Sequence, residues 1–390
     1  MCRIMVMNLG STSFKFKIYE MGETEACIAS GSVESIGSRG RCTVETGEKK
    51  KQRECACATH LEAAEVCFAS LKELGLELDF AGLDAVGYKA VHGGSISGAR
   101  IVDGEVLAEM RRMCPLAPAH NPVYLKMMET MGSLHPELRQ IACFETAFHA
   151  TVPPERYLYG VPLEWVERYG IRRYGFHGSS HSYIAWKMAQ ESPGAHRLIS
   201  IHLGGSCSLC AIREGKSIAN SMGATPQSGI FHNNRVGDLD VFCLPMLAEQ
   251  LGGTETVMRI LAEESGLKGL SGVSNDMRAV EREAAEGNRR ACLALETFAD
   301  GIVGYVGMFT AFLGGLDAIC FTGGIGVNDP LVRKMVTDRL GFVGARLEKS
   351  RNAALREGRL DAEDSRIEIW AFETNEELMV ARACREILQK

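Results

Sequence analysis

The sequence of 390 residues has only 11 prolines and 3 tryptophans, a composition that excludes collagen-like and proline-rich low-complexity proteins. Basic residues are not in surplus: 43 Lys and Arg stand against 49 Asp and Glu, for a net charge of −6. We therefore expect neither nucleic acid nor a membrane as a partner. The longest apolar stretches, such as residues 302–313, contain glycine and are shorter than the roughly 20 residues that span a bilayer.

Common catalytic motifs are also missing. No G-x-S-x-G occurs, so serine hydrolysis has no support, and the Gly-Ser-Ser between His177 and His181 argues against a helical zinc site. Met1 leads directly to Arg3 and a strand-like run, from which we expect no signal peptide and a cytoplasmic protein. The 14 cysteines are then expected to be reduced. Cys207 and Cys210 form the one C-x-x-C, which indicates either a strand or a metal or redox site.

What is present is typical of a globular protein, with 46% hydrophobic and 24% charged residues. At roughly 150 residues per domain, the length predicts two domains. The most informative pattern is a repeat. Apolar residues 4–7 lead into Asn8-Leu9-Gly10-Ser11-Thr12-Ser13, and apolar residues 198–201 lead into His202-Leu203-Gly204-Gly205-Ser206-Cys207-Ser208.

Each copy predicts a β-hairpin that is entered through glycine and hydroxyl residues. In the first copy, Phe14, Phe16 and Ile18 alternate with lysines, and a turn follows at residues 21–23. In the second copy, a strand over 208–212 turns at 213–215 and returns. Backbone N–H groups in such glycine turns suit the oxygens of a polyphosphate, and plain hairpin turns are the alternative.

A second pair of segments supports the repeat. Helical patterns over 60–74 and 289–313 precede the strands at 83–86 and 316–319, and each strand leads to a glycine pair. Two copies in one chain predict two similar α/β lobes, although such short motifs also recur by chance. We therefore expect the glycine turns of both repeat copies to bind one polyphosphate.

Polar clusters beside glycine and proline point to phosphoryl transfer, because that chemistry needs positioned cations, carboxylates and hydrogen-bond donors rather than a covalent nucleophile. Arg235 could stabilise the moving phosphoryl group, and three histidines could donate to its oxygens. Carboxylates could hold a divalent cation. Each of these residues could equally be structural. The histidines are His120, His177 and His202, and the carboxylates are Glu145, Asp238, Asp240 and Glu376.

At these residues the chain resembles the acetate kinase family from end to end. The motifs that carry the resemblance are Asn8 to Ser13, His120-Asn121-Pro122, Tyr174 to His181, Ser221 to Pro226, Ser271 to Arg278 and Thr374 to Leu378. The resemblance implies an α/β, two-lobed actin-like fold, related to sugar kinases and heat-shock ATPases and built from a duplicated βββαβαβα unit. It implies an N-terminal lobe over 1–150 with a C-terminal helix over 376–390, and a C-terminal lobe over 151–375 with the nucleotide pocket.

The resemblance also implies functional roles, with ATP or ADP as co-substrate, Mg²⁺ or Mn²⁺ as cofactor and a homodimer as the assembly. The catalytic set is Arg235, His177, Lys89, Glu145 and His120. The metal would be bound by Asn8 and Glu376. The nucleotide would be bound by Asn8, Ser11, Ser13, Lys15, His202, Gly204, Gly205, Asp276, Met277, Arg278, Gly324, Ile325 and Asn328. The alkyl end of the carboxylate would contact Val91, Ala119, Phe176 and Pro226.

Several residues depart from the family pattern. Lys89 stands where the family has an arginine, and Glu145 stands where it has an aspartate. Lysine is a point charge without the bidentate fork of arginine, so the first change is not conservative. Ala119 stands where the family has a leucine, which predicts tolerance for propionate or butyrate. Gly205-Ser206 replaces an asparagine-glycine pair in the second glycine turn.

We therefore expect a Mg²⁺-dependent kinase that reversibly transfers a phosphoryl group from ATP to acetate, with propionate or butyrate as further candidate acceptors, to give acyl phosphate and ADP. One alternative is a related kinase with another acceptor. A further alternative is a nucleotide-binding module in which the changes at Lys89 and Glu145 have reduced or abolished catalysis.

Overall fold

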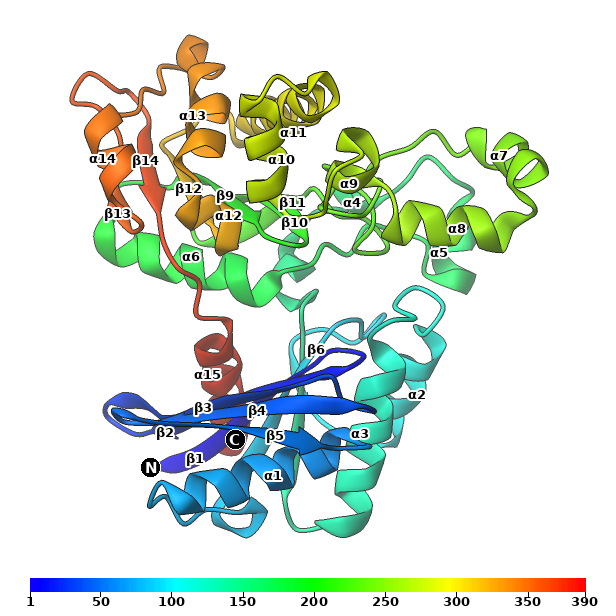
Figure 1. Cartoon of the computed structure of the whole chain (residues 1–390), viewed down its shortest axis with the longest axis vertical. Coiled ribbons are helices and arrows are strands. Elements are labelled where there is room, and N and C mark those ends of the chain that lie inside the picture. Colours follow the sequence, from blue (N-terminus) through cyan, green and yellow to red (C-terminus); the bar gives the residue numbers. More distant parts are fainter. The chain divides into compact units, whose positions relative to one another are not determined.

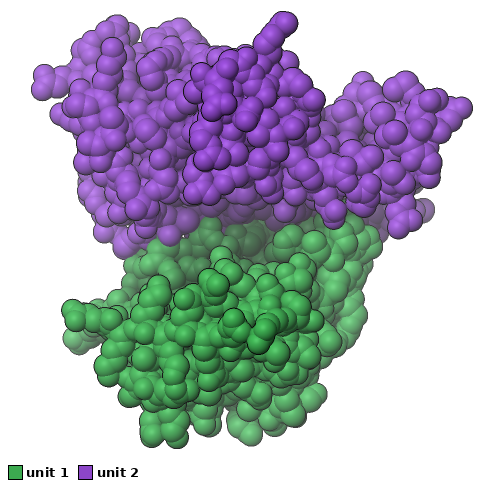
Figure 2. Space-filling model, viewed as in Figure 1, with its two compact units in different colours: residues 1–147, 375–390 green, residues 148–374 purple.

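The computed structural model describes all 390 residues, which form two compact units (Figure 2). Unit 1 comprises residues 1–147 and 375–390, and unit 2 comprises residues 148–374. The chain thus leaves unit 1, builds the whole of unit 2 and then returns to unit 1 for its last helix.

Unit 1 contains an eight-stranded sheet in the order β5-β4-β3-β2-β1-β6-β8-β7 (Figure 1). Its strands are β1 (Cys2–Leu9), β2 (Ser13–Met21), β3 (Glu25–Glu34), β4 (Arg39–Thr46), β5 (Lys49–Ala56), β6 (Ala85–Ala90), β7 (Ala99–Ile101) and β8 (Arg139–Phe144). Its helices are α1 (His60–Glu73), the 3-10 turn η1 (Phe80–Gly82), α2 (Gly104–Arg112), α3 (Asn121–Leu134) and α15 (Glu376–Leu388). The 3-10 turn η2 (Ala147–Thr151) begins at the last residue of the first segment.

Unit 2 contains a six-stranded sheet in the order β11-β10-β9-β12-β14-β13. Its strands are β9 (Arg197–Leu203), β10 (Cys207–Arg213), β11 (Lys216–Asn220), β12 (Ala318–Thr322), β13 (Gly358–Arg359) and β14 (Glu368–Ala371). Its first helices are α4 (Pro154–Tyr157), α5 (Leu163–Tyr169), α6 (Gly178–Glu191), α7 (Cys243–Leu251) and α8 (Thr254–Glu263). The others are α9 (Gly266–Ser271), α10 (Met277–Ala285), α11 (Arg289–Leu313), α12 (Gly323–Asn328), α13 (Pro330–Asp338), η3 (Gly341–Val343) and α14 (Lys349–Ala354).

The two sheets share a five-strand core, which confirms the predicted duplication. In unit 1 the core order is β3-β2-β1-β6-β8, and in unit 2 it is β11-β10-β9-β12-β14. Both begin with two antiparallel pairings and end with two parallel pairings. Because the carboxyl ends of parallel strands meet at one edge, each unit brings its glycine turn and its glycine pair to that edge. Strands β4, β5 and β7 extend the first sheet beyond the repeat.

The hairpins follow the predicted side-chain alternation. In β2, Phe14, Phe16 and Ile18 are buried on one face. In the turn between β10 and β11, Glu214 and Gly215 both have positive φ, of 50° and 73°. Two consecutive residues of this kind form the type of two-residue turn whose twist matches the flanking strands.

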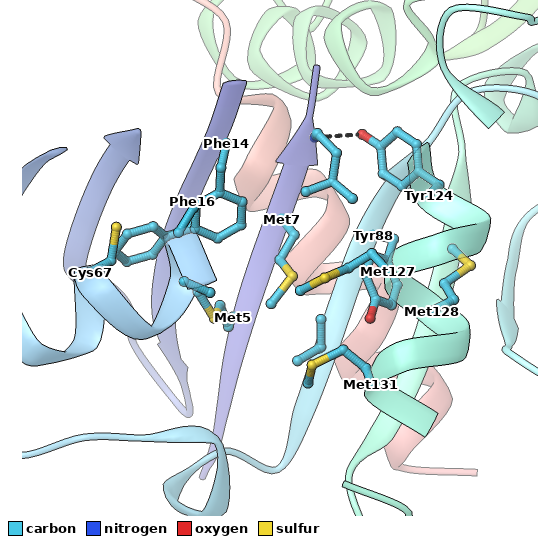
Figure 3. Packing of buried hydrophobic residues seen from close by; sticks show 14 of the residues in the cluster. Met5, Met7, Phe14, Phe16, Cys67, Tyr88, Tyr124, Met127, Met128 and Met131 are labelled. Carbon is cyan, nitrogen blue, oxygen red and sulfur yellow. Dashed lines mark hydrogen bonds between the residues drawn. The ribbon is translucent and has the colours of Figure 1, made fainter. Parts of the chain in front are cut away.

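The core of unit 1 is rich in methionine on both sides of the contact between the sheet and α3 (Figure 3). Met5 and Met7 of β1 lie in the same hydrophobic cluster as Met127, Met128 and Met131 of α3. The hydroxyl of Tyr124, also on α3, accepts a hydrogen bond of 3.0 Å from the backbone N–H of Leu9 (Figure 3). This bond fixes the last residue of β1, directly before the first glycine turn.

Helix α11 is the central helix of unit 2, and its buried face packs in the larger hydrophobic cluster of that unit. By length and composition alone it is the one helix that could cross a membrane. Core helices of water-soluble proteins meet the same criterion, and α11 contributes nine buried side chains to the core, among them Phe298, Ile302 and Phe309. The packing therefore accounts for its apolar character.

Candidate active site

The first glycine turn joins β1 to β2 and is held by its own backbone. The Gly10 N–H donates to the Ser13 carbonyl at 2.9 Å, and a Cβ on Gly10 would stand 2.4 Å from Ser13 Oγ. Ser11 and Lys15 are exposed, while Asn8 and Ser13 are half-buried. The turn thus presents small polar residues at the carboxyl end of β1, as the phosphate-binding prediction requires.

Lys89, near the end of β6, lies among acidic side chains of unit 1. Its ammonium group forms an ion pair with the carboxylate of Glu376, and only 12% of each side chain is exposed. Burial opposes the charge, but Glu376 and Glu145 outweigh it and raise the pKa of Lys89 above its ordinary value. Lys89 is therefore a permanent cation at neutral pH, next to two carboxylates.

Asn121 is a structural residue of unit 1 that the sequence motif did not explain. Its buried amide donates to the carbonyl oxygens of His92 and Met110, both at 2.9 Å, at the start of α3. This joins the His92-Gly93-Gly94 turn to the segment that carries His120, which is half-buried at the N-cap of α3. Of the predicted pocket residues in this unit, Val91 is half-buried and Ala119 is exposed.

In unit 2, His177 precedes α6 and has a strained backbone. It is one of three non-glycine residues with positive φ, at φ 56° and ψ 33°. A left-handed conformation costs such a residue about 1–2 kcal/mol and is found preferentially at functional sites. Its ring stacks on His202 with centroids 4.3 Å apart, and its Nδ1 lies 2.8 Å from Ser208 Oγ. The strain places an imidazole at the edge of the sheet where β9 ends.

The second glycine turn, between β9 and β10, contacts Arg235. The guanidinium of Arg235 donates to Ser206 Oγ and to the Pro226 carbonyl, both at 3.1 Å. Burial lowers the pKa of Arg235 from its ordinary value, but a guanidinium stays charged at neutral pH. Gly204 is half-buried and Gly205 exposed. Within unit 2, therefore, a cation and two histidines surround the predicted phosphate turn.

The residues predicted to bind adenosine lie at two helix starts of unit 2. Asp276 is the N-cap of α10 and pairs with the exposed Arg278 at 2.7 Å. Gly324 and Asn328 are exposed on α12, where the Asn328 amide donates to the Gly324 carbonyl at 2.8 Å, and Ile325 is half-buried. Met277 instead packs in the hydrophobic core with 4% of its surface exposed. Of the residues predicted to contact the alkyl end of the carboxylate, unit 2 contains Phe176, which is buried, and Pro226, which is half-buried.

Asp238 and Asp240, which the sequence raised as candidate cation ligands, both accept hydrogen bonds from groups of unit 2. Asp238 accepts hydrogen bonds from the Gly229 N–H at 2.8 Å and from the Tyr305 hydroxyl at 2.6 Å. Asp240 is exposed and caps the Phe242 N–H. Both carboxylates thus organise the loop that carries Arg235. No group of three or more His, Cys, Asp or Glu side chains is arranged to hold a metal.

The histidine motif begins a helix, although its Gly-Ser-Ser argues against a helical zinc site. Gly178 to His181 form the first turn of α6, so Ser180 and His181 lie on a helix and are fully buried. The small residues Gly178, Ser179 and Ser180 seemed to disfavour a helix, but they allow α6 to begin against β9 and β10. Cys207 and Cys210 lie on β10 and are fully buried, in agreement with the strand interpretation of the C-x-x-C motif.

The motifs and the duplicated sheet can be compared with known proteins. A model described as the acetokinase family matches residues 3–382. The chain belongs to the acetokinase family. It is 40% identical to an acetate kinase of Dictyoglomus turgidum over 97% of this chain and 96% of that protein. It is also 40% identical to a propionate kinase of Citrobacter rodentium, over 97% of this chain and 95% of that protein.

Comparison with solved structures identifies the same family. The crystal structure of Porphyromonas gingivalis acetate kinase matches with a TM-score of 0.89 and 33% identity, covering 100% of both chains. That of a Francisella tularensis propionate kinase matches with a TM-score of 0.91 and 32% identity, covering 98% of this chain and 99% of that chain. These similarities confirm the predicted family and its actin-like fold with a duplicated α/β unit.

Proposed function

We propose that this acetokinase-family protein reversibly transfers the terminal phosphoryl group of ATP to a short-chain carboxylate. The structural observation that carries the proposal is the hydrogen bond from Arg235 to Ser206 of the glycine turn in unit 2. It holds a half-buried cation at a turn whose glycines leave the backbone open to phosphate oxygens. Family membership supports the same chemistry.

In this reaction a carboxylate oxygen attacks the γ-phosphorus of ATP while the bond to the bridging oxygen of ADP breaks. The products are an acyl phosphate and ADP, and no phosphoenzyme forms. Such transfer depends on positioning and on stabilising the charge of the moving group. We assign that stabilisation to Arg235 and His177, with His120 and Lys89 as further donors. Glu145 would act through Lys89, whose charge it helps to maintain.

Mg²⁺ fits the donors that unit 1 provides. Asn8 and Glu376 offer an amide oxygen and a carboxylate, the hard oxygen ligands that this ion prefers, and Mg²⁺ commonly takes only one or two protein carboxylates together with substrate phosphates. The Lys89 ion pair holds Glu376 in place. When bound, the ion would neutralise negative charge on the phosphates.

From the family resemblance we assign contacts with the alkyl end of the acid to Val91, Ala119, Phe176 and Pro226, with acetate as the first candidate acceptor and propionate or butyrate as larger ones. The relatives named above include both acetate and propionate kinases. The remaining nucleotide contacts are assigned to the exposed residues Ser11, Lys15, Gly205, Arg278, Gly324 and Asn328.

The decisive experiment couples acyl-phosphate formation from acetate, propionate and butyrate with calorimetric measurement of ATP binding. Turnover that Mg²⁺ supports and that Arg235→Gln lowers by about 10²-fold or more would support the proposal. ATP binding without turnover on any acid would instead favour the nucleotide-binding module. In that case Lys89→Arg combined with Glu145→Asp should raise turnover sharply, and no increase would exclude reduced catalysis through these two changes.

We also infer a homodimer in the cytoplasm. Helices α7 and α8 pack against each other in unit 2 and carry exposed apolar side chains (Figure 1). Phe242 is 86% exposed, Met246 59% and Met258 53%. Exposed large apolar side chains are typical of an interface when they lie together, and a second copy of the chain is the partner that the family resemblance implies. Light scattering should give twice the chain mass, and Phe242→Asp should shift the protein toward the monomer.

A further inference from the structure

A chain of hydrogen bonds between four side chains runs from Ser200, in the interior of unit 2, to His177. Ser200 Oγ lies 2.8 Å from His181 Nδ1, and His181 Nε2 lies 2.8 Å from Ser208 Oγ. Ser208 Oγ in turn lies 2.8 Å from His177 Nδ1. Ser200, Ser208 and His181 have no exposed surface. The sequence places them on β9, β10 and α6, so three elements of unit 2 meet in this chain of hydrogen bonds.

The number of protons available decides the direction of these bonds. A neutral imidazole has one N–H and one acceptor nitrogen, and each serine has one O–H. His181 is neutral because complete burial lowers its pKa well below the ordinary value. Its ring is the one hydrogen-bond partner of the Ser200 hydroxyl. If His181 carried its proton on Nδ1, the buried Ser200 O–H would have no acceptor, which costs free energy.

The opposite arrangement gives an acceptor to both serine O–H groups and to the N–H group of His181. Ser200 donates to His181 Nδ1, and His181 therefore donates from Nε2 to Ser208. The Ser208 hydroxyl, having accepted that bond, donates to His177 Nδ1. The proton of a neutral His177 is then on Nε2. The Ser180 hydroxyl, 2.8 Å from Nδ1 of the stacked His202, orders that second ring in the same way.

We propose that His181, Ser200 and Ser208 are positioning residues that hold the proton of His177 on Nε2, so that His177 acts as a hydrogen-bond donor to the transferring phosphoryl group. The inference rests on the proposed function for the role of the donor, but the tautomer itself is a property of unit 2 alone. With the proton on Nδ1, the Nε2 lone pair would meet phosphoryl oxygens and repel them. A correct tautomer is a large effect in other enzymes that depend on histidine.

Imidazole ¹⁵N chemical shifts measure the tautomer directly. The protein is labelled with ¹⁵N-histidine, long-range ¹H–¹⁵N spectra are recorded at neutral pH, and His177→Gln and His181→Gln assign the two rings. We expect both rings in the Nε2–H form in the protein without nucleotide. Ser208→Ala removes the donor to His177 Nδ1 and should shift His177 toward a mixture of tautomers.

The same variant is then tested in the kinase assay. We expect kcat to fall by about tenfold to 10²-fold, while the KM values for ATP and acetate change by less than about twofold, because the lost interaction acts in the transition state. Ser200→Ala, at the far end of the chain of hydrogen bonds, should shift both rings in the same direction with a smaller loss of kcat. If Ser208→Ala does not fold, Ser200→Ala provides the test of the tautomers in its place.

Ser217→Ala is the matched control. Ser217 is equally buried and bonds the ring of His149 at 2.8 Å, but it forms no hydrogen bond with His177 or His181. It should leave the His177 tautomer and kcat unchanged. An Nδ1–H form of His177 or His181 in the unaltered protein would overturn the inference, as would an unchanged tautomer in both serine variants. If the tautomers are as expected but no acid is phosphorylated, the proposed function fails and the ordering of the rings stands.

Discussion

Lys89 and Glu376 form a buried ion pair although 287 residues separate them in the chain. The pair joins the end of β6 to the first residue of α15, the helix with which the chain returns to unit 1. The sequence motifs did not show which acidic group compensates the charge of Lys89, the lysine that replaces the arginine typical of the family. The partner is Glu376, the residue to which the resemblance assigns the metal, so one carboxylate has both a structural and a proposed functional role.

Removing one member of this ion pair should destabilise unit 1 more than replacing both members by apolar residues. Glu376→Gln removes the ion-pair partner of the buried Lys89 ammonium and leaves Glu145 to oppose its charge, at a cost of up to about 3 kcal/mol in the free energy of unfolding. Lys89→Met combined with Glu376→Leu removes both charges but leaves the buried Glu145 carboxylate without Lys89, so it should recover only part of that loss. Urea unfolding of Lys89→Met, Glu376→Leu, the double variant and the unaltered protein measures the coupling. Activity should be lost in all three variants, and equal destabilisation by single and double variants would contradict the account.

The stability of the protein should fall below pH 6.5. Burial lowers the pKa of His149 to about 4 and that of His232 to about 3, and it lowers the pKa of His181 well below its ordinary value. Protons then bind preferentially to the unfolded chain as the pH falls from about 6.5 towards 4, so the stability present above pH 6.5 is lost in that window. Each such histidine should lower the free energy of unfolding by about 2 kcal/mol between pH 7 and pH 5.

His149→Gln tests this prediction against the background of other titrating groups. The variant should be less stable at pH 7, because the hydrogen bonds of His149 to Ser217 and to the Phe176 carbonyl are lost or weakened. Its free energy of unfolding should nevertheless decrease less between pH 7 and pH 5 than that of the unaltered protein. A parallel pH dependence in urea titrations of the two proteins would show that burial of His149 does not control it.

The sequence predicted the features that depend on local patterns. Alternation in β2 and the glycine turns identified the hairpins, and the repeat identified the duplicated sheet, because a strand and its turn are specified by adjacent residues. Contacts between distant segments were not accessible in this way. The bond from Leu9 to Tyr124 and the pair of Lys89 with Glu376 depend on how helices pack on the sheet. The role of His181 was missed for the same reason, since Ser200 and Ser208 reach it from other elements.

Ala119 should determine the size of the acid that is accepted. It stands where the family has leucine, and its side chain lacks about three carbons of that residue, each of which contributes roughly 0.8 kcal/mol when buried. We expect kcat/KM for propionate and butyrate to be closer to that for acetate than in an enzyme specific for acetate. Ala119→Leu should reduce kcat/KM for butyrate by about tenfold or more and leave acetate nearly unaffected. A steep preference for acetate in the unaltered protein would refute this assignment.

Gly323 should be required for nucleotide binding because two strand ends approach closely at this residue. It begins α12 directly after β12, has φ of 78°, and a Cβ there would stand 2.5 Å from the Leu203 carbonyl oxygen. Leu203 immediately precedes the second glycine turn, so Gly323→Ala should displace that turn and raise the KM for ATP about tenfold. It should also destabilise the protein by more than about 1 kcal/mol. Gly304→Ala on α11 is the control, since a Cβ at that residue would have no neighbouring atom within 4 Å, and it should be neutral or stabilising. An unchanged KM for ATP in Gly323→Ala would show that this close approach does not position the phosphate turn.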